Sequence, residues 1–193
     1  MTNTGLATFG RPVDEAYFSI ALKSASPTIP TTSNETLTGY ETVRVSESGI
    51  TPSVDLGKED PVKDWARKDV LSAPSSPSAT LAVPIIDNSS TAKKIKYGAS
   101  KVAANGTSVF DGTTDAWVIV VTELHNDANG EPANLVRYVY PNCVPQSIDL
   151  GTHTRGELII DTVTFQLIYD TTIGGYYKEL PPVAATTTTT TGA

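Results

Sequence analysis

The chain contains one cysteine, Cys143, and two histidines among its 193 residues. A single cysteine excludes an intrachain disulfide, so folding does not need an oxidising compartment. No apolar run approaches the length of a transmembrane span, and residues 1–13 lack the basic and apolar regions of a signal peptide. We therefore expect a protein that folds in the cytosol and does not enter a membrane.

Basic residues are also scarce. Fourteen Lys and Arg stand against 21 Asp and Glu, which gives a net charge of −7. A protein that grips nucleic acid needs clustered Lys and Arg to neutralise the phosphates. The composition therefore argues against attraction to DNA and predicts a surface that repels it.

Motifs that carry chemistry are missing from the sequence. It has no phosphate-binding glycine loop, nucleophile elbow or zinc-ligand spacing. Cys143 and His153 could form a nucleophile pair, but a small buried cysteine is far more common than a catalytic one. The segment 127–131 superficially suggests a calcium loop and lacks the full ligand series of an EF-hand. We expect no catalytic residue, no cofactor and no metal site.

Strand-forming residues are what the chain has in abundance. At 193 residues it suits one well-packed domain, and Val, Ile, Thr and Tyr dominate its patterned segments. The segment 116–124 is apolar on both faces, with Trp117, Ile119 and Val121 on one of them. A strand buried on both sides needs a cover on each side. Because little helix is predicted, a second sheet or another subunit is expected to supply one cover.

Alternating apolar residues predict further strands at 16–22, 40–46, 50–56, 80–86 and 155–170. Pro84 should interrupt the fourth of these, and the hairpin that begins at Trp117 should end at Tyr140, before Pro141. The last strand would span on the order of 45 Å at about 3.3 Å per residue, which is longer than a small sandwich needs. Such a strand suits a sheet that continues into a neighbouring subunit.

One short helix is predicted at about Ser89–Tyr97. Asn88 is a suitable N-cap, Ala92 and Ile95 form a narrow apolar stripe, and Gly98 follows the end. A helix of about two turns is stable only when it packs on a sheet. The sequence therefore predicts that it covers one face of a strand pair.

The segment 47–71 is open to two interpretations. Asp60-Pro61, followed by Val62 and Trp65, has the spacing of a capped two-turn helix. The same residues could form a loop and a strand that carries one exposed Trp. Periodicity does not decide between them.

The expected organisation has three parts. Residues 1–14 form an N-terminal arm, residues 15–180 a β domain, and residues 181–193 a Thr-rich tail. The tail has nothing to bury and is expected to be disordered.

The order of these segments resembles a known family. A strand at 80–86 leads into a helix that ends Ile95-Lys96-Tyr97-Gly98, and the strand 116–120, a polar hairpin and the sequence 137–141 follow. After a turn, residues 156–158 begin a strand that continues from 163 to 170. This order is similar to that of the major tail (tail tube) proteins of long-tailed bacteriophages.

The resemblance implies a mainly β fold, a β-sandwich or barrel of tail-tube type with one flanking helix and a long inter-strand loop. It implies a non-enzymatic structural protein of the virion tail, assembled in the host cytoplasm. Copies would form hexameric rings that stack into a hollow tube through which DNA passes. The implied partners are further copies of the chain and the tape-measure, tail terminator and distal tail proteins.

The resemblance also implies three groups of site residues. Contacts between stacked rings are expected from the long loop, at Val54, Asp60, Trp65 and Arg67. Contacts between subunits through a shared sheet are expected at Tyr138, Tyr140, Leu158, Ile160, Thr162 and Thr164. Acidic side chains that face the channel are expected at Glu157 and Asp161, by alternation along the last strand.

Two alternatives remain open at this point. The first is a surface or adhesion β-sandwich that binds a protein or a glycan, for which Tyr138, Tyr140, Tyr176 and Tyr177 could provide a platform. The second is a small hydrolase that uses Cys143. A stable monomer would favour the first alternative, and loss of an activity on thiol alkylation would favour the second.

Overall fold

The computed structural model describes residues 10–12, 17–57, 59–63, 69–74, 76–126, 132–152 and 158–184. In these residues the fold is mainly β with one short α-helix, as the sequence predicts. The helix α1 is Ser90–Tyr97. The strands are β1 Gly10–Pro12, β2 Phe18–Leu22, β3 Glu41–Thr42, β4 Thr51–Asp55, β5 Glu59–Lys63, β6 Asp69–Pro74, β7 Ser78–Ile85, β8 Trp117–Asn126, β9 Pro132–Asp149, β10 Asp161–Leu167 and β11 Lys178–Ala184.

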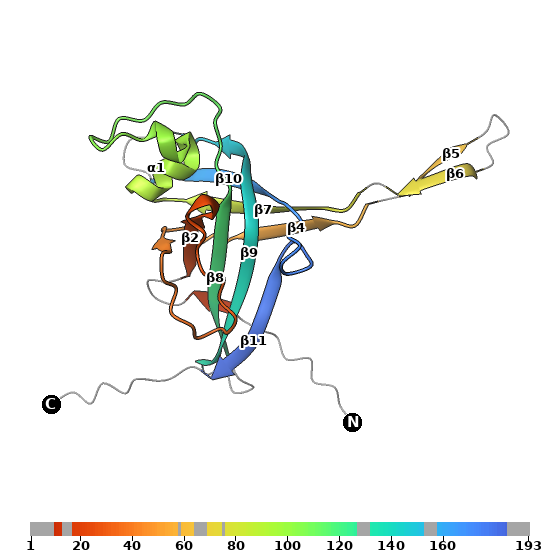
Figure 1. The fold of residues 1–193 in the computed structure, drawn as a ribbon, viewed down its shortest axis with the longest axis horizontal. Helices are drawn as coiled ribbons and strands as arrows, with labels where there is room; N and C mark the ends of the chain where they lie inside the picture. Colours follow the sequence, from red (N-terminus) through yellow and green to blue (C-terminus); the bar gives the residue numbers. More distant parts are fainter. Residues whose placement is uncertain are drawn as a thin grey trace.

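Nine strands form one antiparallel sheet in the order β3-β2-β8-β9-β10-β7-β4, with β1 added to β8 and β11 to β9 (Figure 1). The segment 41–46 closes this sheet on itself. It begins beside β2, where Thr42 is opposite Ser19, and it ends beside β7, where Ser46 N donates to the Pro84 carbonyl at 2.8 Å. Closure makes a small barrel and pairs the edges that an open sheet would leave on β2 and β7.

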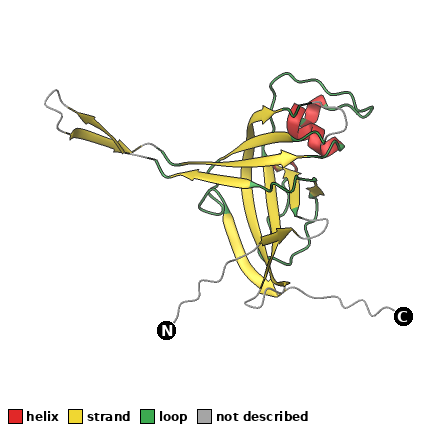
Figure 2. Cartoon of the chain, turned by 180° about the vertical axis from the view of Figure 1, so that it is seen from behind, coloured by secondary structure: helices red, strands yellow, loops and turns green. Residues whose placement is uncertain are grey.

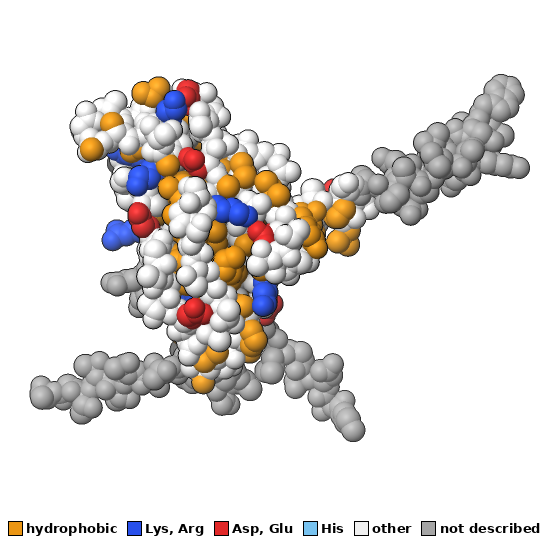
Figure 3. All heavy atoms as spheres, viewed as in Figure 1, with side chains coloured by type: hydrophobic (Ala, Val, Ile, Leu, Met, Phe, Trp, Pro, Cys, Tyr) orange, Lys and Arg blue, Asp and Glu red, His pale blue; other side chains and the backbone are white. Residues whose placement is uncertain are grey.

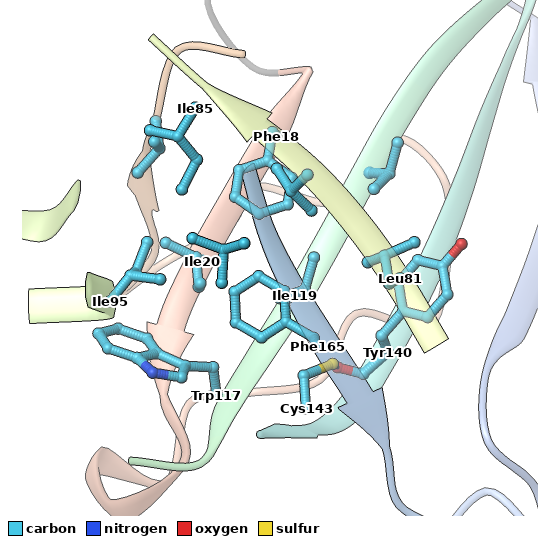
Figure 4. Close-up of a cluster of buried hydrophobic side chains, with 14 of the residues drawn as sticks. Phe18, Ile20, Leu81, Ile85, Ile95, Trp117, Ile119, Tyr140, Cys143 and Phe165 are labelled. Atoms are coloured by element: carbon cyan, nitrogen blue, oxygen red, sulfur yellow. The ribbon is translucent and has the colours of Figure 1, made fainter. Parts of the chain in front are cut away.

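The interior of the barrel holds the main hydrophobic core, and α1 packs over one end of it (Figure 4). Ile95 and Ala92 of the helix are buried in the same cluster as Trp117. The helix N-cap is Ser89 and not Asn88, because Ser89 Oγ accepts from Ala92 N at 3.2 Å. The predicted helix is thus present and docked as expected, with its cap one residue later.

The strand β8 is buried on both faces, as predicted. Trp117, Ile119 and Val121 belong to the barrel core, whereas Val120 packs on the outside with Val139 of β9. The cover on the outside comes from the chain itself, through Ile29, Leu37, Tyr40 and Leu180. The expectation that a second sheet or another subunit supplies this cover is therefore wrong.

Residues 26–40, which we call the strap, are held against the outer face by a buried arginine. Arg137 Nη1 donates to the Glu35 carbonyl at 2.8 Å and to the Thr32 carbonyl at 3.3 Å, and its Nε donates to Thr122 Oγ1 at 3.1 Å. Burial lowers the pKa of Arg137, while the nearby Glu35 acts in the opposite direction. The strap thus gives β8 its second apolar contact without regular secondary structure.

The long strand of the fold is β9, with 18 residues, and not the predicted strand 155–170. It continues through Pro141 instead of ending at Tyr140. A register shift in the pairing with β8 falls between the Trp117 and Ile119 pairs, where Pro141 needs no ladder hydrogen bond. The first half of β9 pairs with β8 and β11, and the second half pairs with β10.

The strand β10 is correspondingly short, and the predicted span of about 45 Å is wrong. Residues 158–160 precede it without strand pairing, and residues 153–157 lie outside the described part. Pro84 does not interrupt β7, since it is opposite Thr162 while its carbonyl accepts a hydrogen bond from Ser46. Residues 40–46 contribute only β3 and a bridge from Val45 to Ile85.

Both ends of the described chain take part in the sheet. Residues 10–12 of the predicted N-terminal segment pair with β8. Residues 181–184, which were predicted to be disordered, form the end of β11. The Pro181 carbonyl accepts a hydrogen bond from Ser33 Oγ at 2.8 Å, which fixes this end to the strap. Besides Pro84 and Pro141 in central strands, prolines lie in outlying strands, at Pro12 in β1, Pro52 in β4, and Pro181 and Pro182 in β11.

Candidate assembly surfaces

A β-hairpin projects from the barrel and is the most prominent feature of the molecule (Figures 1 and 2). The arm, residues 51–77, starts with β4 beside β7 and continues into a separate two-stranded sheet of β5 and β6. Every residue of β4 is exposed, and Val54 and Leu56 are 50% and 83% exposed. Figure 3 shows hydrophobic side chains gathered where the arm leaves the body.

The structure decides between the two interpretations of segment 47–71 for residues 59–63. Residues 59–63 are a strand, with Val62 opposite Leu71, so the helix from Asp60-Pro61 is wrong and the long inter-strand loop is largely a hairpin. Pairing with β6 satisfies the backbone hydrogen-bonding groups of β5. An isolated helix of two turns would be only marginally stable in water. Val54 lies in β4 and Asp60 in β5, whereas Trp65 and Arg67 lie outside the described residues.

A two-stranded hairpin on its own is only marginally stable in water. The β5–β6 sheet pairs with no other described strand. Its formation is therefore favoured by contact with another surface, and its distance from the barrel in Figure 1 means that its own barrel does not provide that surface.

A groove of about 240 Å³ lies at the base of the arm. Its walls are Ile50 and Pro52 from the arm side and Val121 and Glu123 from β8, together with three tyrosines: Tyr138, Tyr140 and Tyr177. The rings of Tyr140 and Tyr177 are 5.6 Å apart at a tilt of 32°. We call this site the tyrosine groove.

The tyrosine groove is aromatic and acidic. Burial raises the pKa of Tyr138, and the carboxylates of Glu179 and Glu123 raise it further. Glu123 Oε2 lies 3.1 Å from His125 Nε2. None of the residues that line the groove is Lys or Arg. The site therefore suits an apolar or aromatic group that carries positive charge.

Two of the predicted sheet-contact residues lie in this groove. Tyr140 is only 5% exposed and belongs to the barrel core, and Tyr138 packs partly against it. Tyr140 therefore offers little area for a flat contact between sheets, because its ring points into the barrel. Three of the four tyrosines that the sequence offers as a platform meet in this groove, with Tyr177 beside Tyr140, whereas Tyr176 is not among its lining residues.

The other four predicted sheet-contact residues lie around β10. Leu158 and Ile160 precede the strand and are 65% and 37% exposed. Thr162 and Thr164 are half-buried in β10, on the face opposite Val163, and so lie outside the barrel. These four are available for contacts, although a shared sheet through them stays a prediction.

The outer face that contains Thr162 and Thr164 has an unusual charge pattern. It is formed by β4, β7, β10 and residues 144–149 of β9, which are neighbours in the sheet. These segments place Asp55 and Asp149 on the outer face and contain neither Lys nor Arg. Negative charge without basic residues in the same strands makes this face poorly suited to holding phosphates.

Asp161, which is predicted to face a channel, forms an ion pair within the chain. Its Oδ2 is 2.7 Å from Lys96 Nζ, and its Oδ1 accepts from Gly151 N at 3.0 Å. Both side chains of the ion pair are largely buried, so this carboxylate contributes little free charge to the surface. Alternation along a long strand did not predict this ion pair, because the strand begins only at Asp161. Glu157 lies outside the described residues.

The cysteine shows no features of a nucleophile. Cys143 is fully buried, and its Sγ donates to the Tyr140 carbonyl at 3.4 Å. Burial raises the pKa of its thiol, which disfavours the reactive thiolate. His153 and the possible calcium loop at 127–131 lie outside the described residues. Within the described part, no group of three His, Cys, Asp or Glu is placed to hold a metal, and no helix could cross a membrane.

No protein-family model matches the sequence, and no curated protein matches it. Among solved structures, the fold is similar to a chain of the "Cryo-EM structure of the anti-feeding prophage (AFP) baseplate, 6-fold symmetrised". The TM-score is 0.42 at 10% identity, over 87% of this chain and 90% of that chain. A similarity of that size does not establish a shared fold, so the function has to be inferred from the residues of this chain.

Proposed function

We propose that this chain is a non-enzymatic structural protein of a phage-type tail, which self-assembles into stacked rings that enclose a hollow tube. Six subunits in each ring, passage of DNA through the tube, and the tape-measure, tail terminator and distal tail proteins as partners follow from the tail-tube resemblance. The proposal rests chiefly on the arm, because it exposes apolar side chains and carries a two-stranded sheet that pairs with no other described strand.

The arm supports self-assembly in two ways. It displays Val54 and Leu56 to solvent, and it continues into a two-stranded sheet that pairs with no other described strand. Exposed apolar side chains on a projecting element are typical of protein–protein contacts. The predicted ring contacts Val54, Asp60, Trp65 and Arg67 all belong to this one element in the sequence.

The acidic outer face supports the role of a conduit. A wall without Lys or Arg does not release counterions from DNA and so gains little affinity for it. The like charge of Asp55 and Asp149 also disfavours close approach. DNA could therefore slide past such a wall without being held.

The test is electron microscopy of the purified full chain. The proposal expects hollow tubes or stacked rings of uniform width, and a stable monomer at high concentration would contradict it. Trp65→Ala should leave a folded monomer that polymerises poorly. The matched control is Phe110→Ala, which removes an aromatic that is 65% exposed in the loop after α1. Normal tubes from Trp65→Ala would remove Trp65 from the assembly contact.

The tyrosine groove favours a second candidate function, a surface protein that binds a glycan. Tyrosine rings at the edge of a groove can pack against sugars as they do against other apolar faces. This candidate predicts a monomer that binds oligosaccharides and loses binding on Tyr177→Ala. A chain that forms tubes and binds no oligosaccharide excludes it.

A further inference from the structure

We propose that the tyrosine groove of one copy binds the tip of the arm of a second copy, residues 64–68. This inference rests on the proposed function, since it requires self-assembly, and it names the surface that receives the arm. The contact joins two different surfaces, the groove of one copy and the arm of another.

The groove and the tip of one molecule cannot meet. Ile50 and Pro52 form the wall of the groove and are also the start of the arm. From Pro52 to Lys63 the chain extends along β4 and β5, which corresponds to roughly 35 Å at about 3.3 Å per residue. The arm leads away from the barrel along this length (Figure 2). A tip that binds such a groove must come from another molecule.

The charges of the two surfaces are complementary. The groove carries Glu123 in its wall, with Glu179 close enough to raise the pKa of Tyr138. The tip reads Asp64-Trp65-Ala66-Arg67-Lys68, so two basic residues stand against one acidic residue. Opposite charges at a contact steer the encounter and set its register.

The side-chain chemistry is complementary as well. Guanidinium and indole groups pack favourably on aromatic rings. Tyr177 is 45% exposed at the rim, and Tyr140, at 5%, forms the floor. Trp65 and Arg67 are residue types that dominate the energetics of interfaces when they enter a desolvated pocket. The groove therefore offers rings and carboxylates to a segment that is rich in their usual partners.

A contact of this kind propagates. Each copy has one groove and one arm, and the two are different surfaces, so they can be occupied by two different neighbours. Repetition then closes into a ring or continues as a stack, whereas reciprocal exchange of arms between two copies would end at a dimer. The geometry thus generates the extended assembly that the proposed function requires.

The first experiment is a reciprocal charge exchange in the full chain. Arg67→Glu and Glu123→Lys should each raise the critical concentration for assembly by about tenfold or more, because like charges then meet in the groove. The double variant Arg67→Glu/Glu123→Lys should recover most of the loss. Glu179→Lys provides a second groove variant at an exposed position, in case Glu123→Lys fails to fold. Asp111→Lys, in the loop after α1, makes the same change in net charge as Glu123→Lys away from both surfaces, and its loss of the ion pair with Lys101 is local to that loop.

The second experiment traps the contact. Arg67→Cys combined with Tyr177→Cys should give a ladder of disulfide-linked oligomers on oxidation, while Arg67→Cys with Phe110→Cys should not. Cys143 is fully buried and does not compete in the native protein. A wild-type chain that assembles, without a ladder from the 67/177 pair and without an effect of the charge variants, overturns this inference and leaves the proposed function intact. A wild-type chain that stays monomeric overturns both, and so does loss of oligosaccharide binding as the only effect of the groove variants.

Discussion

Lys96 Nζ lies 2.7 Å from Asp161 Oδ2, and this ion pair joins α1 to the first residue of β10. The two side chains are 7% and 14% exposed, so water screens the pair only weakly. The pair fixes the helix over its end of the barrel. It also holds the start of β10, because Asp161 Oδ1 accepts from Gly151 N.

Replacing Lys96 with Met should therefore destabilise the protein by about 3 kcal/mol, since it leaves a largely buried carboxylate without its cation. Urea unfolding measures the change. Lys93→Met, on the same helix, removes a lysine with no ion pair among the described contacts and should cost less than about 0.5 kcal/mol. Equal losses from the two variants would show that the ion pair does not stabilise the helix dock.

Arg137 is predicted to control the strap. Arg137→Lys keeps the charge but loses the planar fork that reaches Thr122 and two strap carbonyls. Hydrogen exchange should then speed up in residues 28–40 and stay unchanged in β7 and β10. Arg44→Lys, at an exposed position, is the control. Unchanged exchange in the strap would mean that Ile29, Leu37 and Tyr40 hold it without the arginine.

Cys143 should react slowly in the folded protein. Its burial and raised thiol pKa both reduce the accessible thiolate, so labelling with a chromogenic disulfide at pH 8 should be at least about a hundredfold slower than in denaturant. The measured quantity is the labelling rate of Cys143. Fast labelling of the native protein would place the thiol at the surface and would again favour the hydrolase alternative.

Acid should weaken one long-range link in the barrel. The hydrogen bond from Lys23 Nζ to Asp170 Oδ2, at 2.9 Å, lowers the pKa of Asp170. A lowered carboxyl pKa in the folded state stabilises the fold above the unfolded value near 4. That contribution is lost as the pH falls through the folded value.

The size of this effect should be below about 1 kcal/mol, because Lys23 is partly exposed. Urea midpoints at pH 7 and pH 3 should differ less in Asp170→Asn than in the wild type. Glu47→Gln, at an exposed glutamate, should leave the difference unchanged. An identical pH response in the wild type and Asp170→Asn would exclude the link as a source of acid sensitivity.

The sequence predicted the parts of the fold that have strong periodicity. The two apolar faces of β8, the inward Val163 and Phe165 of β10, and the short helix with Ile95 inward are all present. The secondary structure of these segments can be predicted locally, because the alternation of apolar and polar residues is visible in a few consecutive residues. The arm and its β5–β6 pairing were left open because Asp60-Pro61 fits two local patterns equally well.

The errors arose where long-range contacts override local signals. Pro141 reads as the end of a strand, yet a register shift lets β9 pass through it. Ile29, Leu37 and Tyr40 are isolated apolar residues in a Ser, Thr and Pro-rich segment, so no period shows that they cover Val120. The tyrosine groove combines residues from four separate segments, and only the fold brings Tyr177 beside Tyr140.

Proline in the outlying strands affects whether separate copies of the chain can pair through their strand edges. Pro52 in β4, and Pro181 and Pro182 in β11, leave gaps in the row of amide donors that an incoming chain would need. These gaps disfavour backbone pairing between separate copies of the chain. In the proposed assembly, association then depends on complementary side chains, so each subunit is added where a matching surface is already present.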